Sequence, residues 1–341
     1  MKHDTARPGK PLAPPRIVSL LPSATEMLCA IGGGHLLVGR SHECDFPPEV
    51  ASLPVLTGAR TVDSGTPASA AAIDAQVRGA LAAGESLYTV DGARLRALAP
   101  DLILTQDLCA VCSIDLPAVR RIAATLPEPA QVWSSNPATF EGVLDDMLAL
   151  GAAAGLEDGA AVAVSTLRER MYAAAEHVNA FEDGPNVLFL EWADPLFVGG
   201  HWVPQLVERA GGRHPLNPTR ALRAAGAAAG PIGTTLRFAG KSVRVPVEVA
   251  AASRPDAIII APCGMSLDRA MVEARQLERQ EWFRATPAYR AGRIAVVDGS
   301  AYFSRPGPRL VDAFEWLVEW IGGRADPGRP TIAWAPPRTE P

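Results

Sequence analysis

The chain has 341 residues, which is enough for one large or two medium domains, each with a hydrophobic core. Hydrophobic residues make up 48% and charged residues 20% of the chain, a balance that is typical of globular proteins. The formal net charge is −5 and no run of basic residues occurs, so nucleic acid is not an expected partner.

The first 15 residues are polar and are expected to form a disordered tail without the apolar segment of a secretory signal peptide. No stretch approaches the roughly 20 consecutive apolar residues that a membrane span requires. As written, the sequence predicts a cytoplasmic protein that does not span a membrane. A periplasmic or lipid-anchored location would follow if a leader were missing from it.

Short apolar runs alternate with helical patterns through the first half of the chain. Buried strands are expected over residues 16–21, 36–39, 102–105 and 131–133. Helices are expected over residues 26–31, 70–83 and 139–154. The alternation favours an α/β lobe over residues 16–155.

One long helical pattern covers residues 156–180. About 25 residues span nearly 40 Å at a rise of roughly 1.5 Å per residue, so such a helix could carry the chain from one lobe to another. Beyond it the alternation resumes over residues 181–321 and predicts a second α/β lobe. Residues 213–242 are treated as an insertion, and the proline-rich tail 322–341 is expected to be loosely ordered.

In the second lobe, strands are expected over residues 187–192, 257–260 and 293–297. The sequence therefore predicts two Rossmann-like lobes with mostly parallel sheets. Neither GxGxxG after the first strand nor GxxxxGK[ST] is present, which argues against a nucleotide-binding function. The loop 301–309 places two aromatic residues and two arginines after a strand, where open α/β sheets bind ligands.

Five stretches, in this order along the chain, resemble the vitamin B12-binding proteins that serve ABC importers. They are Arg16–Glu26, Asp45–Pro48, Leu98–Ile103, Asp194–Gly200 and Tyr302–Arg309. The resemblance implies two lobes joined by a single long helix, with a ligand cleft between them. It also implies that the protein binds a corrinoid or an iron chelate and catalyses no reaction.

In that family, aromatic side chains from both lobes face the corrin ring. The matching positions here are Phe197, Tyr302 and Phe303, and Glu43 stands where an aromatic residue is often found. Aromatic rings suit this task because they offer a large apolar area and lose little rotamer entropy. Further candidates for ligand binding lie near predicted strand ends: His42, Gln106, Asp107, Glu191, Trp192, His201, Trp202, Arg305 and Arg309.

Several of these candidates have two interpretations. Gln106 and Asp107 could hydrogen-bond the amide arms of a corrinoid, or they could satisfy their own turn. Glu191 needs a partner if it faces an apolar cleft, and Arg305 or Arg309 could supply it. The two arginines could equally form surface ion pairs of little energetic value.

Relatives that dock on a permease present one exposed glutamate in each lobe. Glu248 stands at the second-lobe position, whereas the first-lobe position is Ala93. An ABC permease is therefore a possible partner that lacks one of the two docking carboxylates, and the chain is interpreted as a cytoplasmic relative that kept the binding fold.

Four cysteines lie in predicted loops, while Cys29 lies within a helix as a small hydrophobic residue. The loop cysteines are Cys44, Cys109, Cys112 and Cys263. They are either reduced thiols, ligands of zinc or an iron–sulfur cluster, or direct ligands of a corrinoid cobalt. His42 and His201 are the alternative ligands for that cobalt.

The leading hypothesis is non-catalytic binding of a cobalamin-like corrinoid. The alternatives are an iron chelate or haem, which the two arginines would favour because such ligands are anionic. A third alternative is an enzyme that uses a cysteine-bound metal or cluster, with Glu43 or Glu191 as the acid–base group. No Ser-His-Asp or Cys-His arrangement with a recognised local context supports that last reading.

Overall fold

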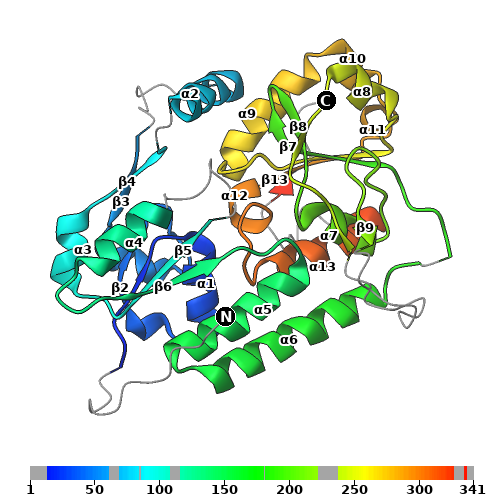
Figure 1. The fold of residues 1–341 in the computed structure, drawn as a ribbon. Coiled ribbons are helices and arrows are strands. Elements are labelled where there is room, and N and C mark those ends of the chain that lie inside the picture. The colour runs from blue at the N-terminus through cyan, green and yellow to red at the C-terminus, as the bar shows by residue number, and fades with distance from the viewer. Residues whose placement is uncertain are drawn as a thin grey trace. The chain divides into compact units, whose positions relative to one another are not determined.

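The computed structural model describes residues 14–60, 69–83, 86–107, 116–179, 181–221, 237–325 and 334–335. The chain forms two compact units, each built from three separate segments. The first unit comprises Met1–Arg60, Ser86–Ser135 and Ala149–Ala160. The second comprises Thr61–Glu85, Asn136–Leu148 and Ala161–Pro341. Both units are α/β, as predicted, and Figure 1 shows their elements.

The first unit contains a four-stranded sheet in the order β2-β1-β5-β6, and all its pairs are parallel. Its strands are β1 (Ile17–Ser19), β2 (Leu37–Arg40), β5 (Leu102–Gln106) and β6 (Gln131–Ser135). The central strands β1 and β5 are buried along their whole length, and each begins with an apolar run, Ile17-Val18 in β1 and Leu102-Ile103-Leu104 in β5. A separate antiparallel pair consists of β3 (Thr57–Ala59) and β4 (Tyr88–Val90).

Short helices connect these strands. They are α1 (Pro22–Ala30), η1 (Gly34–Leu36), η2 (Pro48–Ser52), α3 (Gly92–Leu98) and α4 (Leu116–Ala124). Helix α1 begins with Pro22, whose fixed φ suits the first helical position. Helix α3 is capped by Asp91, which accepts a hydrogen bond from the Arg94 N–H.

The second unit contains a six-stranded mixed sheet in the order β11-β8-β7-β12-β13-β14. The parallel centre consists of β7 (Val187–Ala193), β12 (Ala257–Ile260) and β13 (Ile294–Val297). The antiparallel flanks are β8 (Leu196–Val198), β11 (Val243–Arg244) and β14 (Trp334–Ala335). Strands β7 and β8 form a hairpin, because the two residues between them can join only antiparallel neighbours.

Helices of the second unit surround this sheet, and a short hairpin stands apart from it. The helices are α2 (Ala70–Ala82), α7 (Val203–Arg209), α8 (Val247–Ala252), α9 (Leu267–Glu278), α10 (Glu281–Arg284), α11 (Pro287–Arg290), α12 (Gly299–Tyr302) and α13 (Leu310–Ile321). The hairpin pairs β9 (Arg220–Ala221) with β10 (Arg237–Phe238) and lies within the segment interpreted as an insertion.

The structure gives the bounds of the long helix and describes part of the proline-rich tail. The long helix is α6 (Glu157–Ala175), which ends five residues before the predicted boundary of 180, and α5 (Phe140–Ala154) precedes it. The division between the units falls within both α5 and α6, which lie side by side (Figure 1). The proline-rich tail, expected to be loosely ordered, supplies strand β14, which pairs with β13. None of the helices in the described part of the chain is long and apolar enough to cross a membrane.

Candidate functional site

In the first unit, the parallel strands bring several candidate residues to one edge of the sheet. His42 and Glu43 follow β2, and Gln106 ends β5 with Asp107 directly after it. Since β2, β1 and β5 are parallel neighbours, these residues share the carboxyl edge where α/β sheets bind ligands. Gln106 is buried, whereas Glu43 and Asp107 are exposed.

A hydroxyl from β3 holds the His42 side chain. The Thr57 Oγ1 atom lies 2.6 Å from His42 Nδ1, and it accepts a hydrogen bond from the His42 N–H at 3.0 Å. One ring nitrogen is therefore engaged with the protein, and Nε2 is the nitrogen left for a ligand. A histidine that binds a metal through one ring nitrogen usually forms a hydrogen bond to the protein through the other.

Sequence reasoning missed Tyr88, the first residue of β4. Its ring centroid lies 5.9 Å from that of His42, and its hydroxyl is 3.5 Å from Glu43 Oε1. It therefore supplies an aromatic ring beside Glu43. No motif marks Tyr88 in the sequence, because only the pairing of β3 with β4 brings it to this loop.

Of the four loop cysteines, the structure describes Cys44 and Cys263, and neither belongs to a metal-binding group of described residues. Cys44 is 1% exposed, and its Sγ lies 3.0 Å from the Thr25 hydroxyl, so it is part of the core of the first unit. Cys29 is half-buried in α1, and burial raises the pKa of its thiol to about 11. Cys263 is half-buried after β12, while Cys109 and Cys112 lie outside the described residues. Within the described ranges, no three His, Cys, Asp or Glu side chains are grouped so as to hold a metal ion.

In the second unit, the side chain of Glu191 on β7 forms hydrogen bonds with two loops. Its carboxylate accepts a hydrogen bond from the Gly200 N–H at 2.8 Å and another from the Ser242 hydroxyl at 2.5 Å. Its backbone carbonyl accepts a hydrogen bond from the Cys263 N–H. Glu191 thus positions the segments after β8 and before β11, which gives this carboxylate a structural task.

Three aromatic residues among the predicted ligand contacts are engaged in packing or hydrogen bonds within the second unit. Phe303 is 2% exposed and packs against Phe189 and Trp316, with ring centroids 4.9 Å and 6.2 Å away. Trp202 is 4% exposed and donates its indole N–H to the Phe303 carbonyl at 2.8 Å. The indole N–H of Trp192 donates to the carbonyls of Ala70 and Asp194, which ties the start of α2 to β7.

His201 and Phe197 remain accessible candidates on the β7–β8 side of the sheet, where both are half-buried. His201 has a φ of +53°, a left-handed conformation that is uncommon for a residue other than glycine. Its N–H donates to the Gly240 carbonyl at 2.9 Å, which helps to hold that conformation. Strained backbone of this kind is frequent at ligand sites.

The loop after β13 presents an aromatic ring together with two cations. The Arg309 guanidinium carbon lies 5.4 Å from the centroid of the Tyr302 ring, within the range of a cation–π contact. Arg305 donates to the Ser300 hydroxyl at 3.3 Å. Tyr302, Arg305 and Arg309 are all half-buried, so each retains surface for a ligand.

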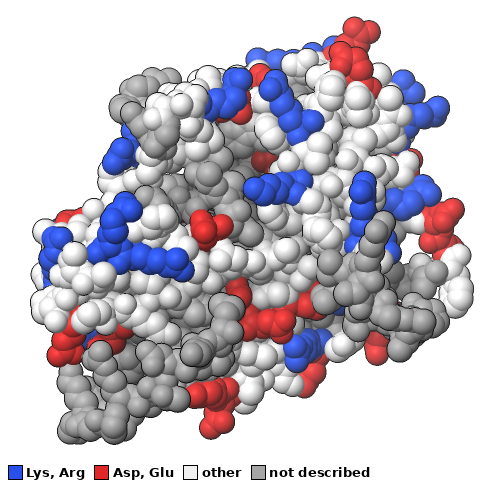
Figure 2. All heavy atoms as spheres, viewed as in Figure 1, with Lys and Arg blue, Asp and Glu red and all other residues white. Residues whose placement is uncertain are grey.

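The two positions compared with transporter-docking glutamates are both exposed. Glu248 lies in the first turn of α8, and Ala93 lies in α3. Figure 2 shows acidic and basic side chains interspersed over the face in view, without a broad patch of one sign.

The chain was then compared with known proteins. Residues 17–301 match a family whose description is "Periplasmic binding protein". A search of curated protein sequences found no significant match.

Solved structures with the same fold include three that match over nearly their whole length. A periplasmic haem-binding protein from Pseudomonas aeruginosa has a TM-score of 0.64 and 21% identity, with 92% of this chain and 95% of that chain covered. The vitamin B12-binding protein BtuF of Vibrio cholerae has a TM-score of 0.62 and 17% identity, with 91% and 98% covered. A possible iron-binding protein from Staphylococcus epidermidis has a TM-score of 0.62 and 18% identity, with 91% and 99% covered.

Proposed function

Because the chain belongs to the periplasmic binding protein family, we propose that it is a non-catalytic binding protein for a metal-bearing tetrapyrrole. Similar folds carry haem in one solved relative and vitamin B12 in another, and both ligands are broad, flat macrocycles. In the first unit Tyr88 lies beside the loop after β2, and in the second unit Tyr302 lies in the segment after β13, and an aromatic ring suits the flat face of such a macrocycle.

The observation that carries the proposal is the group Tyr302, Arg305 and Arg309. An aromatic ring offers a face to a macrocycle, and the two guanidinium groups beside it suit carboxylates, which arginine binds at two points. Haem has two propionates, whereas the arms of cobalamin are neutral amides. This group therefore favours haem or another anionic iron chelate.

A cobalamin-like corrinoid is the second candidate. It is favoured by the first unit, where Gln106, Asp107 and Glu43 could hydrogen-bond amide arms at the carboxyl edge. A side chain that binds the metal of either ligand would have to be a donor such as histidine. His42, whose Nδ1 is engaged by Thr57, is the best-prepared candidate, and His201 is the alternative.

Absorption titrations of the full chain with haemin and with aquocobalamin test the proposal. Saturable binding of haemin with a shifted Soret band would support the first candidate. Shifted corrin bands would support the second, and a change of axial ligand would point to a histidine. If neither spectrum changes at micromolar protein, the proposed function is wrong.

Variants then separate the two ligands. Replacement of both arginines, Arg305→Gln with Arg309→Gln, should weaken haemin binding much more than cobalamin binding. Arg275→Gln on the exposed side of α9 is the matched control for lost positive charge. If the double variant loses affinity for haemin and for cobalamin by the same factor, the arginines do not recognise carboxylates.

A further inference from the structure

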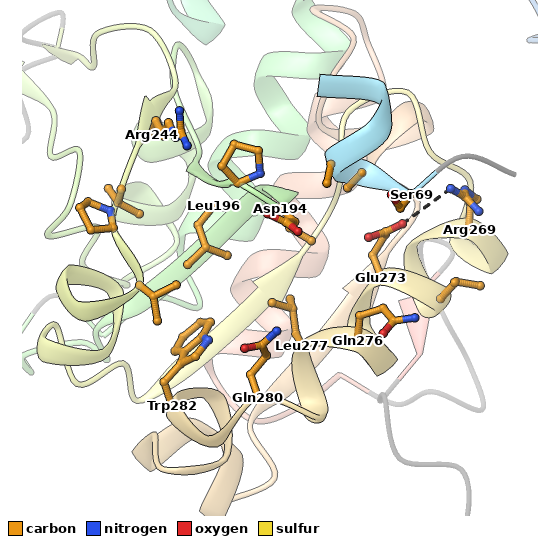
Figure 3. A pocket seen from close by; sticks show the side chains of 18 residues that line it. Ser69, Asp194, Leu196, Arg244, Arg269, Glu273, Gln276, Leu277, Gln280 and Trp282 are labelled. Carbon is orange, nitrogen blue, oxygen red and sulfur yellow. Dashed lines mark ion pairs between the residues drawn. The ribbon is translucent and has the colours of Figure 1, made fainter. Parts of the chain in front are cut away.

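The second unit has a cavity of about 950 Å³ that the proposed tetrapyrrole site does not use. Four segments surround it: the start of α2, the β7–β8 turn, the segment from β11 to α8, and α9 with α10 (Figure 3). Its volume is near the upper end of the range of roughly 300–1,000 Å³ that is usual for ligand pockets.

The cavity has a largely apolar lining. Its larger apolar side chains are Leu196, Val245, Val247, Val272, Leu277 and Trp282. Leu196, Val245 and Leu277 are buried and form the floor, while Trp282 is half-buried. Val247 and Val272 are 38% and 44% exposed, so an apolar occupant would remove their side chains from water.

Two of the charged side chains in the lining, Arg269 and Glu273, already form an ion pair with each other. Glu273 is buried, and Arg269 lies 3.7 Å from its carboxylate, as the dashed line in Figure 3 marks. The same carboxylate accepts a hydrogen bond from the backbone of Ala70 at the start of α2. This pair therefore holds α2 against α9 and forms one wall of the cavity.

The remaining two charges are available to a ligand. Asp194 on the β7–β8 turn and Arg244 on β11 are exposed, and neither side chain forms a hydrogen bond or ion pair with another residue in the described ranges. Both lie beside Leu196 in Figure 3, with Trp282 and Gln280 on the other side of the cavity. The lining thus offers one anion, one cation and an apolar floor.

We propose that this cavity binds a short apolar peptide in its zwitterionic form. The terminal ammonium pairs with Asp194, the terminal carboxylate pairs with Arg244, and the apolar side chains lie on Leu277 and Trp282. A zwitterion carries one group for each of the two protein charges, whereas a ligand with one charge can use only one of them. A single amino acid would fill a small part of about 950 Å³.

Calorimetric titration of the full chain with trileucine tests this proposal, together with trileucine that is N-acetylated, C-amidated or both. Trileucine should bind, and each blocked terminus should weaken binding about tenfold, which corresponds to roughly 1.4 kcal/mol. In Asp194→Asn, acetylation should have no further effect. In Arg244→Gln, amidation should have none.

Asp268→Asn and Arg275→Gln, at exposed positions of α9 outside the cavity, are the matched controls and should bind trileucine as the native chain does. The proposal is overturned if trileucine does not bind at millimolar concentration, or if free leucine binds as tightly. It is also overturned if acetylation weakens binding equally in the native chain and in Asp194→Asn. Haemin or cobalamin absorption reports on the tetrapyrrole site separately.

Discussion

The guanidinium group of Arg309 lies over the ring of Tyr302, 5.4 Å from its centroid. The contact fixes the direction of a half-buried cation at the carboxyl edge of the second sheet. Tyr302 is half-buried, so part of its side chain stays accessible to a ligand. Arg309 supplies the positive charge and Tyr302 supplies the stacking surface. Separate substitutions of the two residues can therefore measure the two contributions to ligand binding.

Tyr302→Leu should weaken binding of both haemin and cobalamin, because either macrocycle would lose an aromatic face. We expect a loss of about tenfold, in line with the roughly 0.5–1.5 kcal/mol that aromatic pairs contribute beyond burial. Absorption titration measures the effect. Tyr289→Leu, at a half-buried position near Phe283 in the core, is the control for a lost tyrosine.

Thr57→Val should remove the hydrogen-bond partner of His42 Nδ1 and leave the conformation of the loop largely unchanged. The variant removes the hydroxyl that lies 2.6 Å from His42 Nδ1. A metal bound through Nε2 would then have a histidine ligand whose ring is no longer oriented by that hydroxyl. Such losses typically weaken metal binding about 10–100-fold. Unchanged affinity and an unchanged axial-ligand spectrum in Thr57→Val would count against His42 and in favour of His201.

His214 should make the protein lose stability in mild acid. It is 2% exposed, its Nδ1–H donates to the Asn217 carbonyl at 3.2 Å, and burial lowers its pKa from 6.5 to about 4. The unfolded chain therefore takes up the proton first, so this contribution is fully present above pH 6.5 and is lost as the pH falls towards 4.

At pH 5 the loss should be about 2 kcal/mol relative to neutral pH. His214→Asn keeps a side-chain donor near Asn217 but does not titrate, so its unfolding midpoint should depend less on pH between 4 and 6.5. Thermal unfolding at a series of pH values measures this. His35→Asn is the control at an exposed position, and an identical pH profile for both variants would contradict the prediction.

Arg170 joins α6 to α13 through two carboxylates. Its guanidinium donates to Glu315 at 2.8 Å and 2.6 Å and to Asp312 at 2.6 Å. Because these side chains are 28–38% exposed, solvent screening should limit the loss in Arg170→Leu to about 1 kcal/mol. A fall of roughly 2–4 °C in the unfolding midpoint is expected.

The difference between Arg170→Leu and the native chain should shrink in 1 M salt, since exposed ion pairs are screened. Arg168→Leu is the control, at an exposed position in the same helix. A salt-independent difference would indicate that the lost packing of the arginine stem, and not its charge, destabilises the variant.

Trp202→Phe should destabilise the second unit. We expect no direct effect of this variant on ligand affinity. The variant leaves the buried Phe303 carbonyl without the indole N–H that reaches it at 2.8 Å. An unsatisfied buried acceptor costs about 1–3 kcal/mol, so the unfolding midpoint should fall by several degrees. Trp282→Phe, at a half-buried position, should change it much less.

The seven predicted strands of the two main sheets are confirmed to within two residues at each end. They could be predicted because each contains a short apolar segment with no competing helical period, and β1, β5, β12 and β13 are buried along their whole length. The antiparallel flanks were missed. Strand β11 has two residues and β14 follows a proline-rich stretch, so neither carries a periodic signal.

The candidate site was harder to predict than the fold, as Tyr302 and Phe303 illustrate. The two aromatic residues are adjacent, yet Tyr302 ends α12 under Arg309 while Phe303 packs in the core against Phe189. Sequence shows the residue types but not the direction in which each ring points, which packing against α13 decides. Tyr88 was missed for a related reason, since its contact with His42 depends on the pairing of β3 with β4.

Helix α2 belongs to the second unit although the strands next to it in the sequence, β3 and β4, belong to the first. Its start at Ala70 is held by Trp192 and by Glu273, which the ribosome adds roughly 120 and 200 residues later. At about 5–20 residues per second, α2 waits some 10–40 s for its last partner. During synthesis, this alanine-rich helix therefore spends that interval without the two side chains that hold its start in the folded protein.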